Sequence, residues 1–167
     1  MTGAARSLLP FVFGPGQGAA DSVESDMKKK ASAVWTGSVR EGKGTISSES
    51  GALDAAQYGF KTRFEDGPGT NPEELIGAAH AGCFSMALSA QLGEAGLTPE
   101  RIETTATVTL DKSSDGFTIT AVHLDVSARV PGANQASFET AAMAAKSGCP
   151  VSKVLNATIT MDARLLG

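Results

Sequence analysis

The sequence predicts an α+β fold, and three observations support this prediction. Segments in which apolar and polar residues alternate, as they do in a strand with one buried face, occur in two separate groups. A long apolar segment with helical end signals lies between the two groups, and a second helical segment precedes the last strand. We therefore expect an antiparallel sheet with the element order βββ-α-ββ-α-β, built around a central buried helix.

The predicted strands form an early group and a late group. Turns that contain glycine separate three short strands, at residues 30–39, 45–49 and 57–64. Two longer strands follow at residues 102–110 and 117–130, with a last one at 157–166. The segment Lys112–Gly116 has the composition of a hairpin loop, so we expect the two longer strands to pair.

The central helix has strong signals at both ends. Asn71 is a good N-cap residue, Pro72 suits the first helical turn, and Gly96 ends the segment. The middle of the helix is apolar on nearly every side and rich in Ala and Gly, so we expect it to be buried and closely packed. A second helix is predicted at about residues 134–146, and a short third one begins at Pro150.

Composition limits the classes of function. The chain has 167 residues, enough for one domain with its own core, and 41% of them are hydrophobic. The net charge is −4 and basic residues do not cluster, which argues against binding to nucleic acid or to an anionic membrane surface. No apolar run approaches the roughly 20 residues of a membrane-spanning helix, so we expect no membrane association.

Residues 1–26 differ in composition from the rest of the chain. They are rich in Gly, Ala and Ser, and their apolar run is too short and too interrupted for a secretory signal. We therefore expect a flexible extension at 1–26, a single domain at 27–167 and a cytoplasmic location. In that reducing compartment, a permanent structural disulfide is not expected.

The two cysteines are the main candidates for chemistry. Cys149 precedes Pro150 at a predicted helix N-terminus, where backbone N–H groups and the helix dipole favour a thiolate. Cys83 lies in the middle of the central helix, where a packing role is the ordinary one. Two thiols in a reducing compartment, one of them at a helix end, predict a redox pair. A zinc site would use nearly all the histidines and cysteines of the chain, so we expect no metal.

Cys83 needs a cation from another element if it is to ionise. It lies about 16 Å along the helix from Pro72, beyond the reach of the helix dipole. Arg63 is the preferred cation, because arginine stays charged when buried and can hold a thiolate and a carboxylate together. Arg40 and His80 are the alternatives, although a histidine in this position more often packs than catalyses.

Glu73 is the natural carboxylate partner of such an arginine. Ten residues separate Glu73 from Cys83, about 15 Å on a straight helix, so one guanidinium cannot readily contact both side chains of the same helix. Either the helix is broken, with Gly77 as a weak point, or a second subunit contributes. We therefore predict a homodimer with composite sites.

Four stretches of the sequence resemble the OsmC (osmotically inducible protein C) family, a branch of the OsmC/Ohr thiol peroxidases. They are GKGTISSESG at 42–51, YGFKTRFE at 58–65, GTNPEELIGAAHAGCFSMALS at 69–89 and GCPVSKVL at 148–155. The resemblance covers nearly all of the chain after residue 27. It implies an OsmC-like fold, an intertwined homodimer and no need for a metal, haem or flavin cofactor.

The resemblance also implies an activity and a role for each candidate residue. It makes the chain an organic hydroperoxide reductase in which Cys83 is the peroxidatic cysteine and Cys149 the resolving one. Arg63 and Glu73 match the pair that activates the thiolate, with Arg40 as the alternative arginine. The implied substrate is an alkyl or fatty-acid hydroperoxide, and the implied reductant is an external dithiol of the lipoyl type.

Two other functions remain open at this point. The same scaffold could bind a small ligand without catalysis, with both cysteines as packing residues. Alternatively, Cys83 and His80 could form the nucleophile and the base of a cysteine hydrolase.

Overall fold

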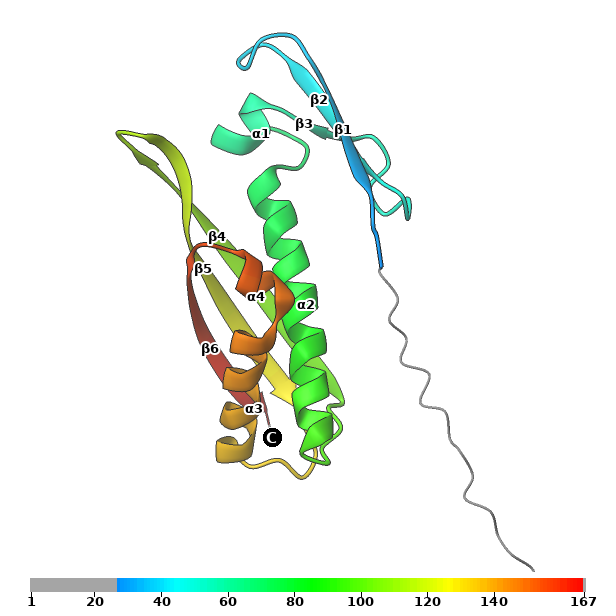
Figure 1. The fold of residues 1–167 in the computed structure, drawn as a ribbon, viewed down its shortest axis with the longest axis vertical. Coiled ribbons are helices and arrows are strands. Elements are labelled where there is room, and N and C mark those ends of the chain that lie inside the picture. Colours follow the sequence, from blue (N-terminus) through cyan, green and yellow to red (C-terminus); the bar gives the residue numbers. More distant parts are fainter. Residues whose placement is uncertain (1–26, 167) are drawn as a thin grey trace, which may run out of the picture.

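The computed structural model describes residues 27–166, which form two three-stranded sheets and four helices (Figure 1). The predicted flexible extension at 1–26 lies outside the described residues. We call residues 27–70 the N-terminal lobe; it contains β1 (Ala31–Thr36), β2 (Lys43–Ser48), β3 (Ala56–Tyr58) and α1 (Phe60–Phe64). We call residues 71–166 the C-terminal body; it contains α2 (Pro72–Glu94), β4 (Arg101–Ser113), β5 (Gly116–Arg129), α3 (Gln135–Gly148), α4 (Pro150–Val154) and β6 (Thr158–Leu166).

The sheet of the C-terminal body has the strand order β4-β5-β6. β4 and β5 form the long antiparallel hairpin that the sequence predicts, and Ser113 pairs with Gly116 at its turn. β6 instead pairs with β5 in parallel, beginning at Ala121 and Thr158, so the expectation of an antiparallel sheet is wrong for this strand. The connection explains the difference, because α3 and α4 form a helical crossover that returns the chain to the end where β5 starts.

α2 and α3 pack on the same face of this sheet and form the core with it (Figure 1). Alternate residues of β5, among them Val122 and Leu124, point into the core, as the two-residue repeat of a strand requires. α2 contributes Phe84, Leu88 and Leu92 at helical spacing. All five of these side chains are fully buried, so the body has an apolar centre of its own.

The central helix α2 begins as predicted. The Asn71 side chain accepts a hydrogen bond from the Glu74 N–H at 2.8 Å, and the helix continues without a break through Gly77. A Cβ atom on Gly77 would lie only 3.1 Å from the Ala106 carbonyl oxygen, so the glycine allows α2 to approach β4 closely. The break in the helix that the sequence left open is therefore absent.

One side of α2 is exposed in the single chain. Met86 is 76% exposed, and a Cβ atom on Gly82 would meet no heavy atom within 4 Å. By length and composition alone, the 23-residue helix α2 is long and apolar enough to cross a membrane, although the sequence analysis found no apolar run of that length. Central helices of globular proteins pass the same test, and α2 packs against β4 and α3. Only 28% of the most apolar stretch of α2 is buried in the single chain, so its exposed side is an apolar surface that a partner would cover.

The N-terminal lobe has almost no core of its own. Its strands form an antiparallel meander, and β1 is exposed along its whole length. Among residues 27–70, Gly44 is the one that is buried. Figure 1 shows the lobe beyond the N-terminal end of α2, where the Phe64 ring of α1 contacts the Phe117 ring at the start of β5, with ring centres 4.9 Å apart. A small sheet without a packed face is marginally stable, so this lobe also needs a partner surface.

A short helix replaces the end of one predicted strand. The sequence predicts a strand at 57–64, but β3 ends at Tyr58 and α1 follows. The Gly59 N–H donates to the Thr62 hydroxyl oxygen, and this hydroxyl donates to the Gly59 carbonyl oxygen, both at 2.9 Å. These two bonds close the first turn of a helix. Arg63 therefore lies on a helix and not, as expected, at the end of a strand.

Candidate active site

The two cysteines meet between α2 and α4. The Cys149 Sγ atom lies 3.0 Å from the Cys83 Sγ atom, and both thiols are free. Cys149 is fully buried, whereas Cys83 is only half-buried and therefore accessible to a small molecule. The sequence analysis proposed this pair from two residues far apart in the chain, and the fold brings them together.

Local chain geometry explains the position of Cys149. The residue ends α3 and begins α4, with extended ψ at 124°, and its N–H donates to the Ala145 carbonyl oxygen at 2.9 Å. Pro150 then occupies the first position of α4, where its missing N–H has no cost. The sharp turn between two helices thus directs the Cys149 side chain toward α2.

The two sulfurs have opposite electrostatic environments. Burial raises the pKa of the Cys83 thiol, and the contact with Cys149 raises it further, while the Val151 N–H opposes these effects. Burial also disfavours the Cys149 thiolate, but hydrogen bonds from Cys83, from Ser152 and from the Val151 N–H lower the pKa of Cys149 overall. Within one chain, negative charge is therefore more stable on Cys149, and the Val151 N–H does not offset the effects that disfavour a Cys83 thiolate.

Arg63 and Glu73 form a second constellation. Arg63 Nη2 lies 2.6 Å from Glu73 Oε1, and Arg63 Nε donates to both carboxylate oxygens at 3.1 Å. The arginine comes from α1 and the glutamate from the first turn of α2, so this ion pair connects the lobe to the body. Arg40 stacks over the Phe60 ring at 5.5 Å instead. Of the two candidate arginines, Arg63 is the one held by Glu73.

The arginine pair and the thiol pair are separate in the single chain. α2 is continuous from Glu73 to Cys83, and ten residues of straight helix span about 15 Å. The guanidinium is held at the start of this helix by its contacts with Glu73. One chain therefore presents two half-sites, one with the sulfurs and one with the cation.

An aromatic hollow adjoins the arginine. Its volume is about 110 Å³, and aromatic rings of the lobe form much of its wall. The Arg63 guanidinium lies 5.3 Å from the centre of the Phe64 ring, and Trp35 contacts Tyr58 with ring centres 5.4 Å apart. Apolar walls next to a fixed cation suit a molecule with one apolar part and one polar, electron-rich part.

His80 does not contact Cys83 as the base of a hydrolase would. His80 Nε2 lies 2.8 Å from the Ser152 hydroxyl oxygen, and Nδ1 has no hydrogen-bond partner among the described residues. The ring is fully buried, and this burial lowers the pKa of His80, so the imidazole stays neutral near pH 7. The sequence analysis did not identify Ser152 as a residue of the site. Its position three residues after Cys149 was the signal that could have indicated it.

Known proteins are similar to this chain in sequence. A model of the OsmC-like protein family matches residues 65–164. Peroxiredoxin OsmC of Escherichia coli (strain K12) is 58% identical over 137 residues, which are 82% of this chain and 96% of that protein. The chain belongs to the OsmC-like family. The resemblance expected from the sequence motifs is thereby confirmed.

Crystal structures of OsmC-like and related proteins share the fold. An OsmC-like protein of unknown function from Vibrio cholerae has a TM-score of 0.67 at 16% identity, covering 83% of this chain and 99% of that one. The organic hydroperoxide resistance protein OhrB of Bacillus subtilis has a TM-score of 0.61 at 24% identity, covering 81% and 98%. The predicted α+β, OsmC-like fold is therefore confirmed.

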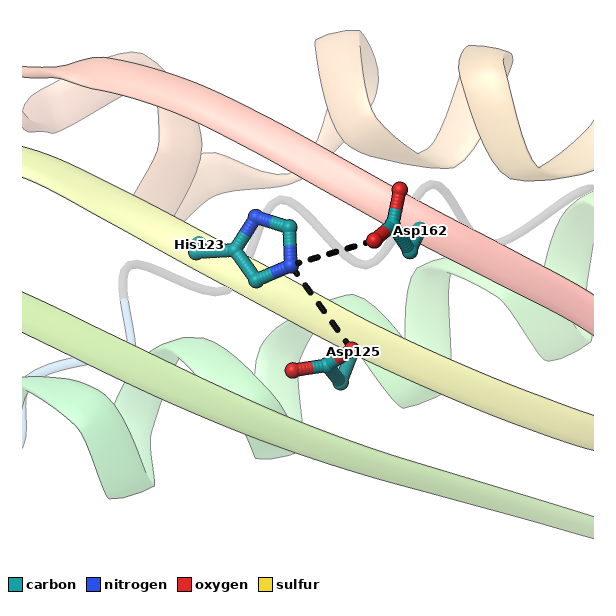
Figure 2. A group of neighbouring side chains, drawn as sticks. All are labelled: His123, Asp125 and Asp162. Carbon is teal, nitrogen blue, oxygen red and sulfur yellow. Dashed lines mark ion pairs between the residues drawn. The ribbon is translucent and has the colours of Figure 1, made fainter.

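This OsmC-like chain also carries an exposed cluster on the outer face of the body sheet (Figure 2). His123 Nε2 lies 3.7 Å from a carboxylate oxygen of Asp125 and of Asp162, and Nδ1 lies 2.8 Å from the Thr160 hydroxyl oxygen. Within residues 27–166, these three side chains are the group with the spacing of metal ligands. Arg164 lies 3.9 Å from Asp125 and already compensates its charge. We interpret the cluster as a surface ion-pair network.

Proposed function

We propose that this chain is a thiol-dependent peroxidase that reduces organic hydroperoxides to alcohols and protects against oxidative stress. The observation that carries the proposal is the 3.0 Å contact between two free cysteine sulfurs, one of them accessible. The name of the Escherichia coli relative, a peroxiredoxin, and that of OhrB, an organic hydroperoxide resistance protein, agree with this chemistry.

In the first step, the Cys83 thiolate attacks the distal oxygen of the hydroperoxide. The O–O bond breaks, Cys83 becomes a sulfenic acid, and the alkoxide leaves as an alcohol after it takes up a proton. The Arg63 guanidinium stabilises both the thiolate and the negative charge that develops on the leaving oxygen. Glu73 fixes the orientation of the guanidinium through the hydrogen bonds described above.

In the second step, Cys149 condenses with the Cys83 sulfenic acid. A disulfide forms and water is released. The sulfurs have to move from 3.0 Å to the S–S bond length of about 2.05 Å, a small shift of the short helix α4. An external dithiol, of the lipoyl type by family analogy, then reduces the disulfide by exchange. We propose a cytoplasmic location, since the cycle needs a reducing compartment.

We propose that the active site is completed by a second copy of the chain. The pKa of Cys83 is raised in the single chain, so Cys83 needs a cation that its own Arg63 does not deliver along a continuous α2. In a homodimer, the Arg63–Glu73 pair of one protomer would lie against the thiol pair of its partner. Each protomer would then contribute one half of each site.

Two exposed surfaces support this dimer. The exposed side of α2 carries small residues and Met86, which suit close packing against another helix. The exposed apolar residues of the lobe, such as Val34 and Val39, would likewise be covered. A second copy of the chain would thus bury the exposed apolar surfaces of both α2 and the lobe. A membrane would bury that of α2 but not that of the lobe.

The activity is tested by consumption of an alkyl hydroperoxide with a dithiol reductant. The Cys83→Ser variant is expected to lose turnover. The Cys149→Ser variant is expected to form a sulfenic acid that dimedone traps, without disulfide closure. Full turnover by the Cys83→Ser variant would contradict the proposal, as would covalent acyl-enzyme formation without peroxide consumption.

The composite site is tested by mixing two inactive variants. When Cys83→Ser and Arg63→Met chains are refolded together, a mixed dimer contains one site with both Cys83 and Arg63. About a quarter of wild-type activity should return, since about half of the dimers are mixed and each has one complete site. If Arg63 acts within its own chain, no site is complete and no activity returns.

The dimer surface is tested by a matched pair of substitutions. Met86 on α2 and Met143 on α3 are both exposed in the single chain, at 76% and 55%. A glutamate at either position would cost little in a monomer, but a glutamate at Met86 would bury a charge in the proposed interface. We expect Met86→Glu to yield monomers by sedimentation and Met143→Glu to remain dimeric. Equal behaviour of the two variants would argue against this interface.

A further inference from the structure

Two contacts between α2 and α4 lie next to each other. The first joins the Cys83 and Cys149 sulfurs at 3.0 Å, and the second joins His80 Nε2 and Ser152 Oγ at 2.8 Å. His80 precedes Cys83 by three residues and Ser152 follows Cys149 by three. Residues three apart lie on the same face of a helix, so the second contact supports the same segment that carries the first.

The hydrogen-bond pattern around His80 assigns its proton. The buried, neutral imidazole has one N–H, and Nδ1 has no partner among the described residues. An unpaired buried N–H is rarer than an unpaired acceptor, so we assign the hydrogen to Nε2. His80 Nε2 then donates to the Ser152 oxygen.

This assignment determines where the Ser152 hydroxyl can donate its hydrogen. Because its oxygen accepts from His80, its own hydrogen is available to the Cys149 sulfur, one turn away at the start of α4. The Ser152 N–H and, after it, the Ser152 side chain both lower the pKa of Cys149. Within one chain, cationic side chains on the neighbouring segments do not supply this effect: Lys146 donates to the Ile159 carbonyl oxygen at 3.1 Å, and Lys153 is exposed. In the proposed dimer, the partner's Arg63 would favour the thiolate equally with and without the Ser152 hydroxyl, so it does not account for a difference between wild type and Ser152→Ala.

We propose that His80 and Ser152 are positioning residues for the resolving step, in which His80 orients the Ser152 hydroxyl and this hydroxyl stabilises Cys149 as a thiolate. The inference rests on the proposed function, which makes Cys149 the resolving cysteine. The Cys149 thiolate attacks the sulfur of the Cys83 sulfenic acid, an S–S bond forms and the S–O bond breaks. The hydroxide that leaves takes the proton that Cys149 released, giving water.

Single-turnover kinetics with one equivalent of an alkyl hydroperoxide test the role of Ser152. For Ser152→Ala we expect disulfide closure to be about threefold slower at pH values where Cys149 is mostly protonated. The variant has a smaller fraction of Cys149 thiolate, and the higher nucleophilicity of that thiolate offsets part of the loss. At higher pH, where Cys149 is ionised in both proteins, the deficit should disappear and Ser152→Ala should close up to about threefold faster than wild type, because only the higher nucleophilicity of its thiolate remains. The control is Ser147→Ala on α3, whose hydroxyl donates to the Met143 carbonyl oxygen. A merely structural loss would slow closure by the same factor at every pH and would overturn the proposal.

Two substitutions separate the donor role of His80 from packing. His80→Gln keeps an N–H near the position of Nε2 and should give the wild-type pH profile of closure. His80→Leu removes the donor and should shift the profile to higher pH, as Ser152→Ala does. Identical profiles for the Gln and Leu variants would exclude His80 from the role.

A measurement without peroxide keeps the inference distinct from the proposed function. In a Cys83→Ser background, the thiolate absorbance at 240 nm reports the ionisation of Cys149 alone. Adding Ser152→Ala should raise the midpoint of this titration by about one pH unit, and an unshifted midpoint would overturn the inference. Failure of the wild-type chain to consume hydroperoxide would overturn the proposed function, whatever this titration shows.

Discussion

The C-terminal body and the N-terminal lobe differ in how much structure one chain can complete. The body closes an apolar core between its sheet and two helices, and within it the two sulfurs lie 3.0 Å apart. The lobe has an entirely exposed first strand and one buried residue among those described. The complete region thus holds the sulfurs, and the incomplete region holds the arginine that we propose for their activation.

This difference between the two regions links the proposed dimer to the activation of Cys83. The Arg63–Glu73 ion pair joins the two regions at the start of α2, far from Cys83 on the same helix. A chain without a partner would keep its thiols together but lack a cation beside Cys83. In the proposed dimer, the contacts that stabilise the lobe are also those that complete the active site.

The largest expected effect is on the arginine of the lobe. Arg63→Met should lower kcat/KM for an alkyl hydroperoxide about 10²- to 10³-fold, the usual cost of removing a donor aimed at developing charge. Arg40→Met is the control, because Arg40 stacks on Phe60 and is not held by Glu73. We expect the control to stay within about threefold of wild type. Equal losses would show that the two arginines were assigned wrongly.

The packing contrast is tested with the same substitution in both regions. Val126 of β5 is 3% exposed and Val34 of β1 is 64% exposed. Val126→Ala should lower the free energy of unfolding by about 2 kcal/mol, and Val34→Ala by less than about 0.5 kcal/mol at low protein concentration. Urea unfolding at several protein concentrations measures both values. If a second copy covers β1, the cost at Val34 should grow with concentration.

The buried histidine of the body predicts a smaller effect in acid. Its pKa is lowered below the ordinary value of 6.5, so below pH 6.5 the unfolded chain binds a proton that the folded chain does not. Stability should therefore fall as the pH falls, by up to about 1.4 kcal/mol per pH unit. His80→Gln should remove this slope. Unfolding curves between pH 7 and pH 5 provide the comparison.

The smallest expected effect concerns the outer face of the body sheet. Arg164 and Asp125 form an exposed ion pair at 3.9 Å, with side chains 73% and 49% exposed. Arg164→Ala should change the free energy of unfolding by less than about 1 kcal/mol, and added salt should reduce the difference. A larger effect would mean that another surface covers this face. Thermal unfolding at low and high ionic strength measures it.

Elements with strong local signals were predictable. The cap at Asn71, the hairpin turn before Gly116 and the alternation along β4 and β5 all lie where the sequence places them. The failures occur where local signals are weak. The segment at 57–64 (QYGFKTRF) is short and mixes aromatic with polar residues, so its pattern does not separate a strand from a helix, and the Gly59–Thr62 hydrogen bonds close a helical turn. The parallel pairing of β6 follows from its helical crossover, which strand alternation does not encode.

The sequence by itself determined which residue types are present, where α2, α3 and α4 begin and which cysteine precedes a helix. Capping and strand alternation are local, because the atoms involved lie within a few residues of each other. Only the tertiary structure decided that sulfurs 66 residues apart meet, that His80 finds Ser152 72 residues later, and that Arg63 stays with Glu73. These contacts depend on how α2, α3 and α4 pack around a common core, and packing is a property of the whole chain.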